Sequence, residues 1–317
     1  MAKTKTKRRR RSAPVRPMQA PRRLEATRRL PGWAYGLGGA LLVAALAAGA
    51  FLLGKQNAQL GSEGPAAASD GLPNTADYHS LSVAPNDPEH ILLGTHAGLY
   101  ESTDGGRNWN RVALQGQDAM NLAPGEGETV WAAGHNVLAR STDGGQTWSD
   151  VQPDRLPSLD VHGFAIDSRD GTLWAAVAGE GLFRSTDGGE SFEPVSEEVG
   201  GNVMALAVTP EGRLLAGDMQ QGLLTSENEG RDWRVAEPAA VMGLAVNPED
   251  PTVVVAAGPG ILRSSDGGAS WEQVFPLGEG AGPVAWSPSN PDVGYVVGFD
   301  RTLYRTQDRG SSWQPVS

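Results

Sequence analysis

The chain has 317 residues, a net charge of −11 and no cysteine. The lack of cysteine excludes disulfides and thiolate metal ligands. Residues 1–33 contain twelve Lys or Arg and a single acid, whereas the chain from residue 56 onward contains 13 Arg, no Lys and 36 acids. An acidic surface repels phosphate, so the larger part is not expected to bind nucleic acid.

Residues 34–54 are expected to form a transmembrane signal anchor. The twenty residues from Ala34 to Leu53 carry no charge, and as a helix they could cross the hydrocarbon layer. Most positive charges precede this stretch, which places the amino terminus in the cytoplasm and the rest of the chain outside. A cleaved signal peptide and a buried core helix are the alternatives. The long basic leader disfavours the first, and the flanking arginines disfavour the second.

The segments on either side of the anchor contain too few apolar residues to form a core. Residues 1–33 are basic and contain proline, which predicts a disordered cytoplasmic tail. Residues 55–76 are rich in Gly, Ala and Ser, which predicts a flexible linker. The expected localisation is the cell membrane, with a single span and an extracytoplasmic domain at residues 77–317.

An eight-residue motif recurs six times after the linker. It reads Ser-Thr-Asp-Gly-Gly-Arg-Asn-Trp at residues 102–109, and related copies begin at residues 141, 185, 226, 264 and 306. Each period of about 40 residues contains four short strand-like segments, as one propeller blade does. We predict an all-β fold, a six-bladed β-propeller of four-stranded antiparallel blades, preceded by one transmembrane α-helix.

The repeated motif is expected to support folding and to perform no chemistry. Its glycines permit positive φ, its Ser and Asp side chains can satisfy turn amides, and its Trp covers the hairpin. The acidic position is occupied in turn by Asp104, Asp143, Asp187, Asn228, Asp266 and Asp308. We expect Asn228 to weaken the fourth turn without abolishing it.

With this motif repeated over residues 102–313, the chain resembles the Asp-box, or BNR-repeat, superfamily of sialidase-like β-propellers. That superfamily includes sialidases, two-domain xyloglucanases, sortilin-type receptors and photosystem II assembly factors. The chain looks most like bacterial membrane-anchored propellers that are often labelled glycosyl hydrolases. The resemblance covers about three quarters of the sequence, and the repeat specifies a fold and not a function.

A glycoside hydrolase is the alternative to a binding protein. The resemblance to sialidases implies three arginines at the ligand face, and only Arg155 and Arg301 are unrepeated arginines expected there. Another glycosidase would need only two carboxylates. The acids expected on that face are Asp118, Asp154, Asp160, Glu180, Asp218 and Asp300. We assign no catalytic residue and lean away from an enzyme.

Four of the five histidines are expected at one end of neighbouring blades. Alignment on the proline after each first strand places six equivalent residues around the channel mouth, namely His79, Asp118, His162, Met204, Met242 and Gly282. His96 and His135 occupy matching loops on the same face, and His90 lies on the opposite one. Imidazole and thioether donors suit copper or another soft divalent metal. Packing of Met and hydrogen bonding of His to the backbone is the alternative.

The sequence thus favours a non-catalytic, membrane-anchored binding or assembly module. Its partner is expected to be an extracytoplasmic protein or a glycan, held at the channel-mouth face with or without a metal. The photosystem assembly factors, which resemble this chain in the repeat, suggest a role in assembling a membrane complex.

Overall fold

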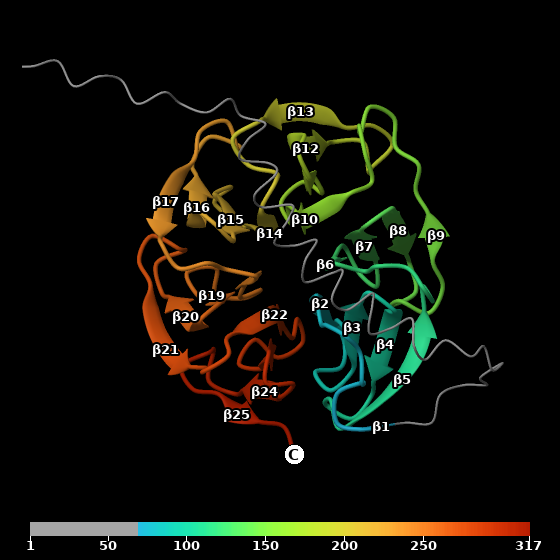
Figure 1. The fold of residues 1–317 in the computed structure, drawn as a ribbon, viewed down its shortest axis with the longest axis vertical. Coiled ribbons are helices and arrows are strands. Elements are labelled where there is room, and N and C mark those ends of the chain that lie inside the picture. Colours follow the sequence, from blue (N-terminus) through green and yellow to red (C-terminus); the bar gives the residue numbers. More distant parts are fainter. Residues whose placement is uncertain (1–68) are drawn as a thin grey trace, which may run out of the picture. The chain divides into compact units, whose positions relative to one another are not determined.

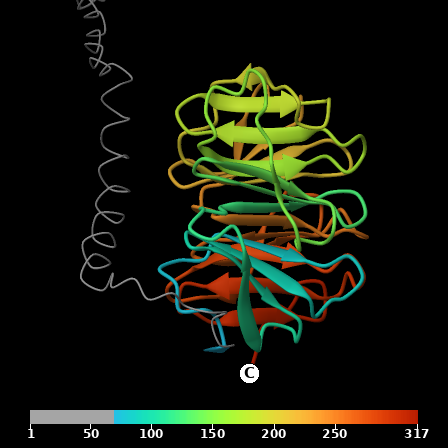
Figure 2. The same cartoon turned by 90° about the vertical axis from the view of Figure 1, so that its right-hand side faces the viewer.

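The computed structural model describes residues 69–317, and these residues form a six-bladed β-propeller (Figure 1). The blades are antiparallel sheets that follow one another around a central channel, with the first strand of each blade innermost and the fourth at the rim. Figure 2 shows the same ring from the edge. The prediction of six blades, each with four antiparallel strands, is confirmed, and the first blade carries one additional strand.

The first three blades occupy residues 69–196. Blade 1 contains β1 (Ser69–Asp70), β2 (Ser80–Val83), β3 (Ile91–Thr95), β4 (Gly98–Ser102) and β5 (Asn108–Ala113). Blade 2 contains β6 (Asn121–Pro124), β7 (Val130–Gly134), β8 (Val137–Ser141) and β9 (Ser149–Asp150). Blade 3 contains β10 (Val161–Ile166), β11 (Leu173–Val177), β12 (Gly181–Ser185) and β13 (Glu193–Ser196).

The last three blades occupy residues 203–315. Blade 4 contains β14 (Val203–Val208), β15 (Leu214–Asp218), β16 (Gly222–Ser226) and β17 (Arg234–Glu237). Blade 5 contains β18 (Gly243–Val246), β19 (Val254–Ala257), β20 (Gly260–Ser264) and β21 (Glu272–Pro276). Blade 6 contains β22 (Ala281–Trp286), β23 (Gly294–Gly298), β24 (Leu303–Thr306) and β25 (Gln314–Pro315).

Apolar side chains line the middle of the central channel. Each innermost strand contributes side chains to a cavity of about 210 Å³. One equivalent position in each blade lines the cavity, and it is occupied by Leu81, Leu122, Phe164, Leu206, Leu244 and Val284. Both faces of the middle strands are buried against neighbouring blades, which explains their nearly continuous apolar sequences.

Each Asp box is a turn between the third and fourth strands that bonds within itself. In the first box, the Ser102 hydroxyl accepts the Gly106 amide at 2.8 Å, while Asp104 Oδ1 accepts the Asn108 amide at 2.9 Å. The Trp109 indole donates to the Gly106 carbonyl at 2.9 Å. These bonds satisfy the polar groups of a turn that would otherwise lack partners.

The propeller was predicted to start at residue 77, but the described fold begins earlier, at β1. β1 pairs with β5 at the rim, the Tyr78 hydroxyl donates to the Pro73 carbonyl at 2.7 Å, and Arg301 donates to Asn74 Oδ1 at 2.9 Å. The end of the stretch expected to be a flexible linker therefore packs on the propeller. The predicted tail and anchor lie outside the described residues, and residues 69–317 include no helix long and apolar enough to cross a membrane.

Candidate functional site at the channel mouth

The mouth of the channel is formed by tight loops after the second strands and by the segments that lead into the first strands. His96 and His135 each begin a two-residue turn, between β3 and β4 and between β7 and β8. Backbone bonds tie these loops to the next blade, because the Ala119 amide donates to Thr95 at 3.2 Å and the Asn136 amide donates to Leu159 at 3.0 Å. Each loop histidine is thereby placed beside the acidic residue that precedes the next blade.

The predicted ring of equivalent residues is wrong in blade 2. Met120, and not Asp118, lies two residues before the channel-lining Leu122, just as His79 lies two residues before Leu81. The alignment relied on a proline, and Pro124 lies inside β6. An alignment error of two residues keeps each side chain on the same face of the strand. The alternation of polar and apolar residues therefore does not reveal the error.

Correct alignment shows an acidic residue two positions before the ring residue in each of the first three blades. These residues are Asp77, Asp118 and Asp160. His96 lies between the first two of them, and His135 lies between the second and the third. Carboxylates and imidazoles therefore alternate along an arc over three blades. The sequence interpretation did not include Asp77, the first residue of the predicted propeller, among the site residues, and did not connect Asp160 with the histidines.

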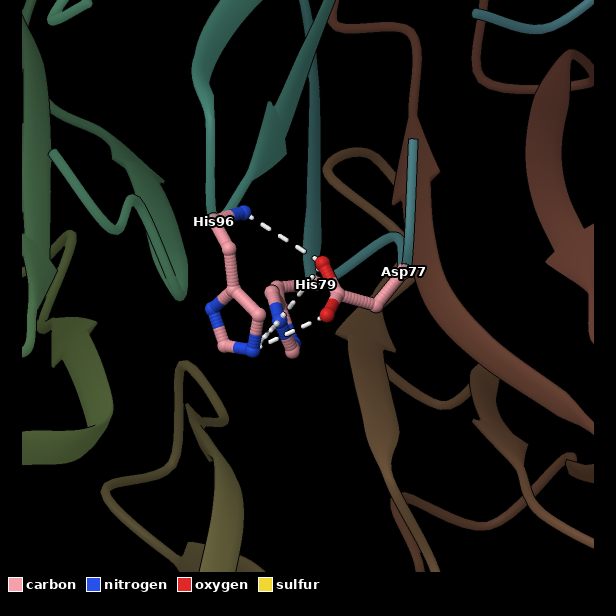
Figure 3. A group of neighbouring side chains, drawn as sticks. All are labelled: Asp77, His79 and His96. Carbon is pink, nitrogen blue, oxygen red and sulfur yellow. Dashed lines mark hydrogen bonds and ion pairs between the residues drawn. The ribbon is translucent and has the colours of Figure 1, made fainter. Parts of the chain in front are cut away.

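The first group of the arc consists of Asp77, His79 and His96 (Figure 3). The His96 Nε2 lies 2.9 Å from Asp77 Oδ2, and the His79 Nε2 lies 3.2 Å from Asp77 Oδ1. The two Nε2 atoms are 3.3 Å apart. Figure 3 shows both rings turned toward the same carboxylate.

The second group consists of His135, Asp160 and His162, and Asp118 connects it to the first. The two Nε2 atoms lie 3.0 Å apart, at 3.3 and 3.1 Å from the same Asp160 oxygen. The Nδ1 atoms of His96 and His135 both lie 2.6 Å from Asp118 Oδ2. The other Asp118 oxygen and the His162 Nδ1 are buried and have no hydrogen-bond partner.

Mutual hydrogen bonding shifts the pKa values along the arc. Burial tends to raise the pKa of Asp77 and of Asp118, but hydrogen bonds with their histidine neighbours outweigh burial and hold both pKa values well below the usual range. The hydrogen bonds with Asp118 and with Asp77 raise the pKa of His96 to about 10. Asp118 likewise raises the pKa of His135, whereas burial lowers the pKa of His162.

Methionines line the channel just inside the mouth. A small cavity of about 60 Å³ is lined by His79, Met120, Met204 and Met242, together with residues of the innermost strands. His162 and Met204 lie where the pairing of β10 and of β14 shifts register, and such bulges redirect a side chain. Thioether groups are therefore close to the arc in the fold. The two ligand groups themselves, however, consist only of imidazole and carboxylate.

The other half of the mouth exposes two large apolar side chains. Met219 and Phe299 follow β15 and β23 and are 42% and 41% exposed, although both are large apolar residues. Their amides donate to Asn202 and Gly280, which precede the innermost strands of the same blades. A Cβ at Gly282 would lie 3.1 Å from the Phe299 ring, so this ring covers the position that His79 occupies in blade 1.

Most of the acids considered for a hydrolase are engaged in other contacts. Asp154 bonds with Glu190 and Phe192 of the third box, so its predicted placement on the ligand face is wrong. Asp218 and Asp300 accept amides of their own turns. Asp118 and Asp160 do meet, through His135, but both also pair with histidines. Glu180 is exposed. Arg301 donates hydrogen bonds to residues 73–75.

The comparisons with solved structures identify similar folds. A structure described as YCF48 bound to D1 peptide is 23% identical, with a TM-score of 0.51, and the alignment covers 80% of this chain and 86% of that one. YCF48 from Cyanidioschyzon merolae is 17% identical, with a TM-score of 0.50 and coverages of 78% and 87%. The GH74 xyloglucanase from Xanthomonas campestris is 17% identical, with a TM-score of 0.55 and coverages of 80% and 46%.

The family comparison is more specific than these similarities of fold. No curated protein matches the sequence. The model of the family described as photosynthesis system II assembly factor YCF48 matches residues 72–314, which is nearly the whole propeller. The chain therefore belongs to the YCF48 family of BNR-type β-propellers.

Proposed function

We propose that this chain is a membrane-anchored, extracytoplasmic assembly module that binds a segment of a client protein across the channel mouth. Membership of a family of assembly factors supports a non-catalytic, protein-binding role. A YCF48 structure holds a D1 peptide, which supports a polypeptide as the class of ligand.

The observation that carries the proposal is the difference between two sides of the mouth. The arc of Asp and His lies on blades 1 to 3, while Met219 and Phe299 lie exposed on blades 4 and 6. An extended segment crossing the mouth can place an apolar side chain on one half and polar groups on the other. Exposed large apolar residues next to a polar rim are typical of protein-binding surfaces.

Site-specific cross-linking tests this function. A photo-reactive amino acid at position 219 or 299 should cross-link the full-length chain to one client segment in intact membranes, as found by mass spectrometry. Val235 in β17 is the matched control, because it is an exposed apolar residue at the rim. Equal cross-linking from position 235, or no client from either mouth position, would contradict the proposal.

Anchoring by residues 34–54 is the second part of the proposal, supported by their twenty-residue uncharged run. The full chain should resist extraction of membranes with alkaline carbonate, and its propeller should be cleaved by protease added from outside. A chain that starts at residue 55 should be released. Retention of this shortened chain in membranes, or protection of the propeller from external protease, would show that the anchor is wrongly assigned.

A further inference from the structure

Two groups at the channel mouth that share no residue have the spacing of metal ligands, and a third, His96, Asp118 and His135, overlaps both. Within each of the two separate groups, two imidazole Nε2 atoms and one carboxylate converge, and the contacts between them run from 2.9 to 3.3 Å. In the first group the two rings contact different oxygens of Asp77, and in the second they share Asp160 Oδ1. A tetrahedral zinc site with bonds of about 2.0–2.1 Å has ligand-to-ligand edges of about 3.3–3.4 Å. Small adjustments of the side chains would therefore suffice for an ion to enter each group.

Asp118 orients the histidines of both groups. Its Oδ2 lies 2.6 Å from the Nδ1 of His96 and from the Nδ1 of His135, and contacts this short place the ring protons on Nδ1. Nε2 of each ring lies beside the carboxylate of its own group, so an ion that displaces the Nε2 proton meets a lone pair already directed at the site. A carboxylate that holds the far nitrogen of a metal-binding histidine is the usual support of such sites.

We propose that the channel mouth binds two divalent ions of the zinc and copper(II) class, one at Asp77, His79 and His96 and one at His135, Asp160 and His162. The donor atoms are imidazole nitrogen and carboxylate oxygen, which favour these ions over magnesium or calcium. The sequence predicted copper or another soft divalent metal with methionine among its ligands. Neither ligand group contains a methionine.

The charge of the arc favours cations. The arc contains three carboxylates, Asp77, Asp118 and Asp160, and four histidines. With neutral imidazoles it carries −3, so that one divalent ion leaves −1 and two leave +1. The rings of His96 and His135 are each more than 40% exposed, which leaves a path for ions and room for a further ligand. This inference does not depend on the protein-binding function proposed above.

Metal content and affinity of the full-length chain test the proposal. After treatment with EDTA, the purified protein should bind two zinc ions per chain in calorimetry and retain them in mass spectrometry of the metal content. Magnesium at the same concentration should not bind. His79→Ala and His162→Ala should each retain one ion, and the double variant none. His90→Ala is the matched control, because His90 pairs with Glu101 away from the mouth, and this variant should retain two.

Variants of Asp118 test its positioning role. Asp118→Ala should weaken both sites by about 10- to 100-fold. Asp118→Asn keeps one acceptor oxygen and should recover part of that loss. Circular dichroism should show that each variant is folded.

Three results would overturn the inference. The first is that the folded protein binds no stoichiometric zinc or copper. The second is that the His79 and His162 variants keep the metal content of the parent. The third is that the parent binds one ion and each of the two variants loses that same ion.

Discussion

In the fourth Asp box, the donor and the acceptor of one side-chain hydrogen bond have changed places. In the first box the Asn108 amide donates to Asp104 Oδ2 at 2.7 Å. In the fourth box the Asn228 amide donates to Asp232 Oδ2, also at 2.7 Å. The Asn228 Oδ1 still accepts the Asp232 backbone amide at 3.0 Å. Asn228 and Asp232 together therefore keep the side-chain hydrogen bond of the box, with its donor and acceptor exchanged.

Restoring the common aspartate at this position should destabilise the protein. Asn228→Asp replaces the donor of a 2.7 Å bond with a carboxylate beside Asp232, and the expected loss is about 1 kcal/mol of unfolding free energy. The pair Asn228→Asp with Asp232→Ser recreates the arrangement of the other boxes and should recover most of that loss. Urea denaturation of both variants and of Asp232→Ser completes a double-mutant cycle. A more stable Asn228→Asp variant would refute the exchange.

The first strands show how far the sequence could predict the fold and the candidate site. The six boxes mark the blades because each repeat must form the same turn, and the histidines follow from counting within each repeat. Met120 was missed because Pro124 is the last residue of β6, two positions before the place that Pro85 takes after β2. Asp77 was missed because it precedes the first repeated segment. The convergence of the Nε2 atoms depends on loop bonds between blades, such as that from Asn136 to Leu159, which have no sequence pattern.

The box turns also determine how the blades respond to acid. The side chain four residues later donates a hydrogen bond that, with turn amides, lowers the pKa of Asp104, Asp143 and Asp266 to about 2. The pKa of Asp187 is lowered in the same way. At Asp308 the pKa is lowered although burial acts in the opposite direction. Five of the six boxes therefore prefer the ionised form when folded.

Stability should consequently fall at low pH. Each folded pKa is below the unfolded value of 3.8, so the stabilisation is fully present above about pH 4 and is lost as the pH falls toward 2. Thermal unfolding followed from pH 7 to pH 2 should show the midpoint decreasing over that interval. Asp143→Asn should be a few degrees less stable than the parent at pH 7 and equal to it near pH 2.

Asp150→Asn controls for the loss of a negative charge, because Asp150 is exposed on β9 outside the box. Its unfolding midpoint should follow that of the parent at every pH. A constant difference between Asp143→Asn and the parent across the range would show that the box carboxylate does not titrate with folding.

The ring closes where blade 6 meets blade 1, and no strand is shared between these two sheets. Side chains of both blades pack across this junction. Leu81 and Trp109 of blade 1 pack in one buried cluster with Tyr295 and Leu303 of blade 6. The glycines of the boxes permit this packing, because a Cβ at Gly106 would overlap Leu303.

The Tyr295 hydroxyl should stabilise the junction between blades 6 and 1 through a hydrogen bond. Tyr295 is fully buried, and its hydroxyl donates to the Pro88 carbonyl of blade 1 at 3.0 Å. Tyr295→Phe should cost about 1 kcal/mol, or about 2–4 °C in a domain of this size. Hydrogen exchange should become faster in both β3 and β23.

Tyr304→Phe is the matched control, because the Tyr304 hydroxyl bonds Asp300 at 2.7 Å within blade 6. In this variant, faster exchange should stay in blade 6. A Tyr295→Phe variant with changes confined to blade 6 would show that the ring closes by apolar packing alone.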